Sequence, residues 1–68
     1  MDLSASEAIR LAEQVRAACI DAAKRAFDDA AISGLCHDGA VECAIGAIGA
    51  IDLERLVESW QARDADAR

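Results

Sequence analysis

The sequence contains no proline and no tyrosine, and Phe27 and Trp60 are its only aromatic residues. Without proline the strongest helix breaker is missing, and 54% of the 68 residues are hydrophobic, many of them alanine. Such a chain favours helices but supplies few bulky side chains to hold them together. A chain below about 70–80 residues rarely gains more than ~3–5 kcal/mol from a single core. We therefore expect this chain to be stabilised by association.

Basic residues are also scarce, with 7 Lys and Arg against 13 Asp and Glu and a net charge of -6. Binding to nucleic acids or to anionic membranes needs clustered cations, so neither is an expected partner. The first ten residues lack the basic and apolar regions of a signal peptide. The most apolar stretch, residues 39–51, is too short for a membrane span. Three cysteines, an odd number, fit a reducing compartment, and we expect a cytoplasmic protein.

A first helix is predicted over residues 5–32. Ser4 is a suitable N-cap, and Glu7 three residues later completes a capping box. Gly34 is placed to end the helix in the left-handed conformation, with Leu35 behind it for the accompanying apolar contact. The apolar arc covers roughly half of the circumference, more than the ~100° stripe that one partner requires. This helix is therefore expected to have partners on two sides.

The rest of the chain predicts two shorter helices. Helical periodicity extends over residues 39–51, where Gly46 and Gly49 each cost about 1 kcal/mol relative to alanine. Those glycines indicate either a close backbone approach or a weak helix. The apolar phase then shifts at Asp52, an N-cap for a helix over residues 53–62. Residues 63–68 are polar and are expected to form a frayed tail.

The predicted fold class is all-α, with the long helix packed antiparallel on a kinked two-helix arm. We find no linker or internal repeat and expect a single small helical domain over residues 1–68. Two such hairpins together can bury apolar surface that a single hairpin leaves exposed, so we expect a homodimer with a four-helix-type core. The expected interface residues are Leu11, Val15, Ala18, Ala22, Leu56 and Trp60.

Side chains that can bind zinc lie close together in the sequence, at the turn between the first two predicted helices and just after it. Cys36, His37 and Cys43 could form a zinc site or a reactive thiol, because thiolate and imidazole bind zinc. Cys36, near a helix N-terminus, is the better candidate for a stabilised thiolate. The spacing contains no C-x-x-C pair, and a fourth ligand would have to be the distant Cys19. Small apolar thiols are the commoner interpretation, so no metal or cofactor is expected.

Other chemistry has weaker support in the sequence. His37 could serve as a general base or pH sensor, but no set of nucleophile, base and orienting residue accompanies it. Asp38 and Glu42 are acidic residues typical of a first helical turn. Ser33 lies between Ile32 and Gly34, so the Asp-Ser-Leu attachment motif of acyl carrier proteins is absent. We therefore expect no enzymatic activity.

The segment from Ile32 to Glu42, I-S-G-L-C-H-D-G-A-V-E, resembles a segment of short bacterial proteins of unassigned function. The resemblance covers residues 26–53. Some of those proteins carry an acetyltransferase label, but this chain is too short and lacks the strands of such a fold. The resemblance implies no catalytic residue.

The function expected from the sequence is a helical interaction module, a small regulator or accessory subunit. It would act through self-association and through docking of an unknown protein partner. Leu53, Leu56 and Trp60 are the expected contacts to that partner, because Trp is a frequent anchor at interfaces. Trp60 packed against the first helix is the competing interpretation. The alternative function is a thiol or metal site at the turn between the first two helices.

Overall fold

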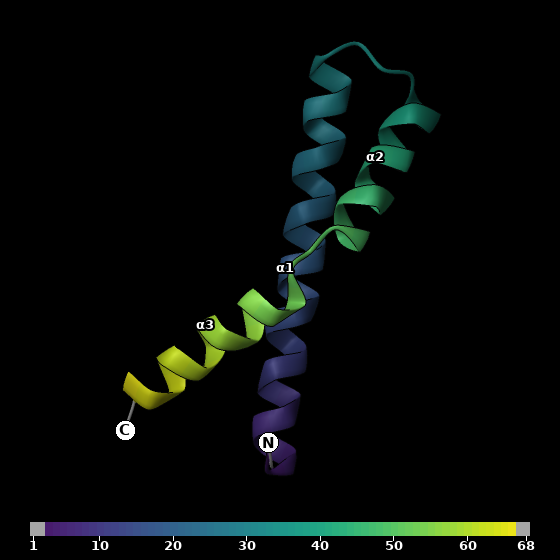
Figure 1. Cartoon of the computed structure of the whole chain (residues 1–68). Helices are drawn as coiled ribbons and strands as arrows, with labels where there is room; N and C mark the ends of the chain where they lie inside the picture. Colours follow the sequence, from purple (N-terminus) through teal and green to yellow (C-terminus); the bar gives the residue numbers. More distant parts are fainter. Residues whose placement is uncertain (1–2, 67–68) are drawn as a thin grey trace. The chain divides into compact units, whose positions relative to one another are not determined.

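The computed structural model describes residues 3–66, with side chains for residues 3–63. It contains three helices, α1 (Ala5–Ile32), α2 (His37–Gly49) and α3 (Leu53–Asp66), as Figure 1 shows. No strand occurs in this part of the chain, and the predicted all-α class is confirmed. Contacts divide the chain into two units. Unit 1 joins α1 up to Arg16 with α3, and unit 2 covers Ala17–Ile51.

Local side-chain chemistry sets the N-terminus of α1. The Ser4 hydroxyl oxygen accepts a hydrogen bond from the Glu7 backbone N–H at 3.2 Å, so Ser4 is the N-cap. The Glu7 side chain accepts a hydrogen bond from the same hydroxyl at 3.2 Å. Ser4 and Glu7 therefore interact as predicted. The Glu7 carboxylate binds the Ser4 hydroxyl, however, and not the Ser4 backbone N–H of a standard capping box.

A Schellman motif ends α1. Gly34 has φ 90°, in the left-handed region that favours glycine. Its N–H donates to the carbonyl of Ala31 at 3.1 Å, and the N–H of Leu35 donates to the carbonyl of Ala30 at 3.0 Å. These two bonds satisfy carbonyls that would otherwise lack partners at the helix end. The predicted role of Gly34 is confirmed.

The helix α2 begins two residues before the predicted residue 39. Cys36 is its N-cap, with φ −69° and ψ 167°, and its sulfur accepts a hydrogen bond from the Gly39 N–H at 3.4 Å. The sequence predicts Cys36 as a possible ligand and not as a cap, because Ser, Thr, Asp and Asn usually occupy that position. Within unit 2, α2 runs back antiparallel to α1 (Figure 1).

The helical arm breaks between Gly49 and Leu53, close to the predicted kink. The N–H of Ile51 bonds to the carbonyl of Ile48 at 3.3 Å, which tightens the last turn and ends α2 before the predicted residue 51. Asp52 then caps α3, because its carboxylate accepts from the Arg55 N–H at 3.0 Å. This confirms the predicted cap.

The helix α3 is longer than predicted. Residues 63–66, assigned to a frayed tail, are helical, while residues 67–68 lie outside the described part of the chain. Two properties favour the extension. The segment after Gln61 contains neither glycine nor proline. Arg63 also lies in the last turn, where a cation interacts favourably with the helix dipole.

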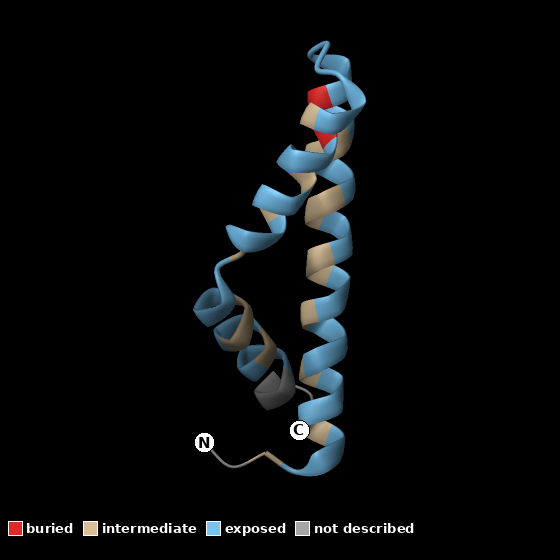
Figure 2. Ribbon diagram, turned by 90° about the vertical axis from the view of Figure 1, so that its right-hand side faces the viewer, coloured by how far each residue is buried: buried red, intermediate tan, exposed pale blue. Residues whose placement is uncertain are grey.

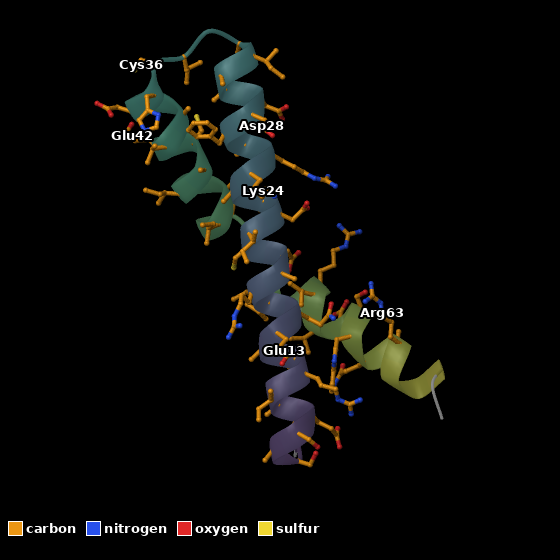
Figure 3. All side chains as sticks on the ribbon, turned by 180° about the vertical axis from the view of Figure 1, so that it is seen from behind. Glu13, Lys24, Asp28, Cys36, Glu42 and Arg63 are labelled. Carbon is orange, nitrogen blue, oxygen red and sulfur yellow. The ribbon has the colours of Figure 1, made fainter. Side chains whose placement is uncertain are left out.

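Burial is confined to small side chains. Among the described side chains, Ala30 (7% exposed) and Ala40 (1% exposed) are the buried residues, and no large side chain is fully buried. Figure 2 shows the buried positions, in red, at the end of the α1–α2 hairpin nearest the turn. Lys24 and Asp28 lie on the side of α1 away from α2 (Figure 3). Unit 2 is therefore a hairpin closed by alanine packing, with little apolar volume inside it.

Candidate interaction surfaces

The helix α2 turns its small side chains to α1 and leaves its bulky ones exposed. Ala40 is buried, and Ala44 and Ala47 are half-buried, in an i, i+4, i+7 row. A second row at the same spacing consists of Val41, Ile45 and Ile48, which are 36%, 63% and 40% exposed. We call this second row the α2 aliphatic face. Periodicity alone predicts Ala44, Ala47 and the three bulky residues on one apolar side, and the structure separates the alanines from the bulky residues.

Two glycines lie beside this face, and no packing among the described residues accounts for them. A methyl group placed on Gly46 or Gly49 meets no atom within 4 Å, so neither glycine permits a close approach within the described chain. Both belong to a tripeptide repeat, Ala-Ile-Gly-Ala-Ile-Gly-Ala-Ile over residues 44–51, which the sequence analysis missed. Each period of three falls about 60° short of a helical turn. Within α2, Ile45 and Ile48 are therefore displaced around the helix relative to each other.

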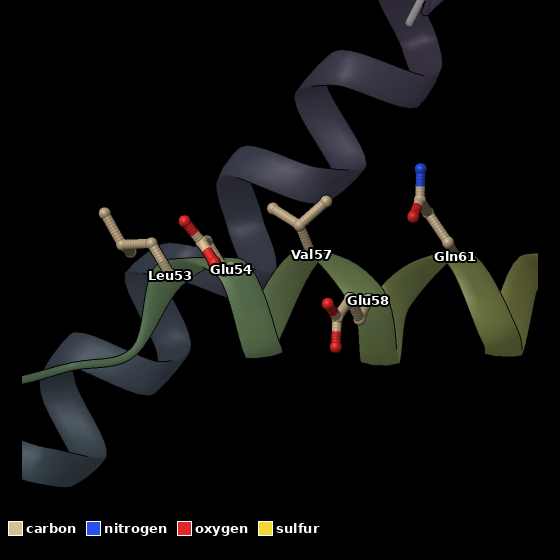
Figure 4. A pocket seen from close by; sticks show the side chains of 5 residues that line it. All are labelled: Leu53, Glu54, Val57, Glu58 and Gln61. Carbon is tan, nitrogen blue, oxygen red and sulfur yellow. The ribbon is translucent and has the colours of Figure 1, made fainter.

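The second surface is a shallow, largely open groove of about 470 Å³ along one side of α3. We call it the α3 groove, and its lining residues are Leu53, Glu54, Val57, Glu58 and Gln61. Figure 4 shows Leu53, Val57 and Gln61 rising from the same edge of α3, with the two glutamates beside them. Leu53 is 55% exposed and Val57 is half-buried. An apolar row thus runs next to an acidic row.

The six residues predicted for a dimer interface are all half-buried in the single chain. They are Leu11, Val15, Ala18, Ala22, Leu56 and Trp60. The two alanines belong to unit 2 and the other four to unit 1, so no single unit brings all six together. Their role in contacting a second copy stays a prediction. The half-burial of Trp60 is compatible with both of the roles considered for it.

The turn between α1 and α2 holds the predicted soft ligands. Cys36 and Cys43 are exposed free thiols, and Cys19 is half-buried. The His37 ring lies edge-on to Phe27, with centroids 5.7 Å apart. Among residues 3–66, no group of three or more His, Cys, Asp or Glu residues is arranged to hold a metal ion. In this part of the chain Cys36, His37 and Cys43 therefore do not form a metal-binding cluster.

No family model, curated protein or solved structure matches the chain. The resemblance of the segment from Ile32 to Glu42 therefore stays a prediction. Within the described residues, no helix combines the length and apolarity needed to cross a membrane. The candidate interaction surfaces of the chain are therefore the α2 aliphatic face and the α3 groove.

Proposed function

We propose that this chain is a non-enzymatic helical interaction module, a small regulator or accessory subunit acting through self-association and partner docking. One observation carries the proposal: among the described side chains the buried residues are the alanines Ala30 and Ala40, while Val41, Ile45 and Ile48 are exposed. A soluble domain normally reserves its bulky aliphatic residues for its core. A row of them left outside is typical of a surface that a partner covers.

The energetics favour a second copy of the chain as the partner of the α2 aliphatic face. Burying an isoleucine side chain completely contributes about 1.5–3 kcal/mol, and Ile45 keeps 63% of its surface exposed. A domain of this size buries a low fraction of its surface and needs a supplement to its core. In a homodimer every stabilising contact occurs twice. We therefore propose a homodimer in which the α2 aliphatic face is covered.

The composition supports a protein partner and a cytoplasmic location. A net charge of -6 opposes binding to nucleic acids and anionic membranes. The odd number of cysteines, three, fits a reducing compartment. The proposal needs no cofactor.

Thermal unfolding at different protein concentrations tests the proposal. The melting temperature of a homodimer rises with protein concentration, because association stabilises the folded state by mass action. We expect the circular dichroism melting curve to shift upward over a hundredfold increase in concentration. An Ile45→Asp variant should melt at the same temperature throughout. A wild-type melting temperature independent of concentration would contradict self-association.

A reactive thiol at the α1–α2 turn is the second candidate function, favoured by the position of Cys36. Its sulfur is exposed and accepts a hydrogen bond from Gly39 N–H at the start of α2. An exposed sulfur is accessible to oxidants and alkylating reagents. The matched comparison is Cys43, also exposed but inside the helix. If Cys36 reacts with a neutral alkylating reagent no faster than Cys43 does, this second function is wrong.

A further inference from the structure

The α3 groove combines two rows of side chains with the same spacing. Leu53 and Val57 form an apolar row, and Glu54 and Glu58 form an acidic row beside it. Residues four apart on a helix lie roughly 6 Å apart along its axis. The ridges of a second helix have this spacing as well, which is why such rows and the grooves between them receive helices.

The charges on the groove call for a cationic occupant. Glu54 and Glu58 are exposed, and the ion pair found in the described residues, between Arg25 and Asp21 at 3.1 Å, involves neither. Two carboxylates at i and i+4 repel each other by about 0.2–0.5 kcal/mol on an isolated helix. A ligand that brings positive charge to both carboxylates removes this repulsion and gains two ion pairs.

A second copy of the chain does not have the required charge pattern. To meet both glutamates, a docked helix needs two cations three or four residues apart. The Lys and Arg residues occupy positions 10, 16, 24, 25, 55, 63 and 68, and no two of them have that spacing. Nucleic acids and anionic membranes are excluded by the same carboxylates. No single helix of a second copy can therefore pair with both glutamates, which favours a helix of another protein as the occupant.

We propose that the α3 groove docks a basic amphipathic helix of a partner protein. Aliphatic side chains of that helix lie on Leu53 and Val57, and two of its Lys or Arg side chains pair with Glu54 and Glu58. The aliphatic stems of Lys and Arg suit such a mixed surface, since they cover apolar area while the charged ends reach the carboxylates. This inference specifies the partner-docking part of the proposed function and is independent of the self-association part.

The test uses fluorescein-labelled synthetic peptides and the full chain. The probe is a capped helical peptide of Ala, Leu and Lys, with a leucine stripe flanked by lysines four residues apart. A scrambled peptide of the same composition is the peptide control. Fluorescence anisotropy should show saturable binding of the patterned peptide, weaker at high salt because the pairs are exposed. The scrambled peptide should bind far more weakly.

Matched protein variants locate the binding. Glu54→Gln with Glu58→Gln should weaken binding roughly tenfold, the expectation for two exposed ion pairs. Glu13→Gln with Glu42→Gln removes the same charge from exposed positions elsewhere and should leave the affinity within about twofold. Circular dichroism checks that both variants stay helical. Equal weakening by the two pairs of substitutions, equal binding of the scrambled peptide, or no binding at all would overturn the proposal.

Sedimentation of the same proteins separates this inference from the proposed function. A chain that dimerises but ignores the patterned peptide contradicts the α3 groove and leaves self-association intact. A chain that binds the peptide as a monomer contradicts self-association and leaves the groove intact. If Glu54→Gln with Glu58→Gln strengthens dimerisation, the groove belongs to the contact between copies, and the proposal of a basic partner is wrong.

Discussion

The ring of Phe27 meets the ring of His37 edge-on, with centroids 5.7 Å apart and an interplanar angle of 74°. This contact connects the C-terminal part of α1 to the first residue of α2. Aromatic pairs in this geometry contribute about 0.5–1.5 kcal/mol beyond their buried area. Among the described side chains of this hairpin, where the buried residues are alanines, the pair adds an aromatic contact between the two helices.

Replacing Phe27 is therefore expected to weaken unit 2. Phe27→Ala should lower the free energy of unfolding by roughly 1–3 kcal/mol, below the ~3–5 kcal/mol of a fully buried phenylalanine because Phe27 is half-buried. Urea unfolding followed by circular dichroism measures the change. Ile32→Ala, at a site that is 85% exposed, is the control and should change stability by less than about 1 kcal/mol. Equal effects of the two substitutions would contradict the role of Phe27.

Replacing Gly46 and Gly34 with alanine should change the free energy of unfolding in opposite directions. Gly46→Ala should raise the free energy of unfolding by about 1 kcal/mol, because the added methyl group meets open space in a helix. Gly34→Ala should lower it by about 1 kcal/mol or more, because Gly34 has φ 90°. Urea titration of both variants provides the measurement. A loss of stability in Gly46→Ala would show that another surface packs on this glycine.

The cap at the start of α2 gives a third prediction. Cys36→Ala removes the acceptor for the Gly39 N–H and should cost about 1 kcal/mol. Cys36→Ser keeps an acceptor of a preferred type and should match or exceed the wild-type stability. Cys43→Ser, at an exposed site, is the control for loss of a thiol. A Cys36→Ala chain as stable as the wild type in thermal unfolding would mean that the sulfur does not contribute as a cap.

Val15→Asp tests the predicted role of α1 in the dimer. Val15 is half-buried, so a buried charge should destabilise unit 1 and also prevent dimerisation if the predicted interface is right. Size-exclusion chromatography with light scattering, together with circular dichroism, measures both effects. A Val15→Asp chain that folds and assembles like the wild type would remove α1 from the interface.

Features that depend on neighbouring residues could be predicted from the sequence. Ser4, Gly34 and Asp52 each act within three or four residues along the chain, and all three take their predicted roles at helix ends. The separation of Ala44 from Ile45 could not be predicted, because α2 is apolar on most of its circumference. Which row meets α1 is decided by how closely the helices pack, and alanine permits a closer approach than isoleucine.

The candidate surfaces were predicted less well than the fold. Leu53 was expected as a contact residue and does line the α3 groove, whereas the groove's glutamates were not considered. The spacing of Glu54 and Glu58 could have indicated this acidic row, because like charges at i and i+4 on a helix are unfavourable without a partner. Cys36 was predicted as a possible ligand because it carries a sulfur atom. Its position immediately before α2 makes it the N-cap of that helix.

Sedimentation equilibrium of the wild type and Ile45→Asp tests self-association most directly. The account predicts a wild-type mass of twice the 7.1 kDa chain mass at micromolar concentration and a monomer for Ile45→Asp. Gln14→Asp adds one negative charge at an exposed α1 position and should remain dimeric. A wild-type chain that stays at 7.1 kDa at every concentration, while unfolding cooperatively, would contradict the central claim.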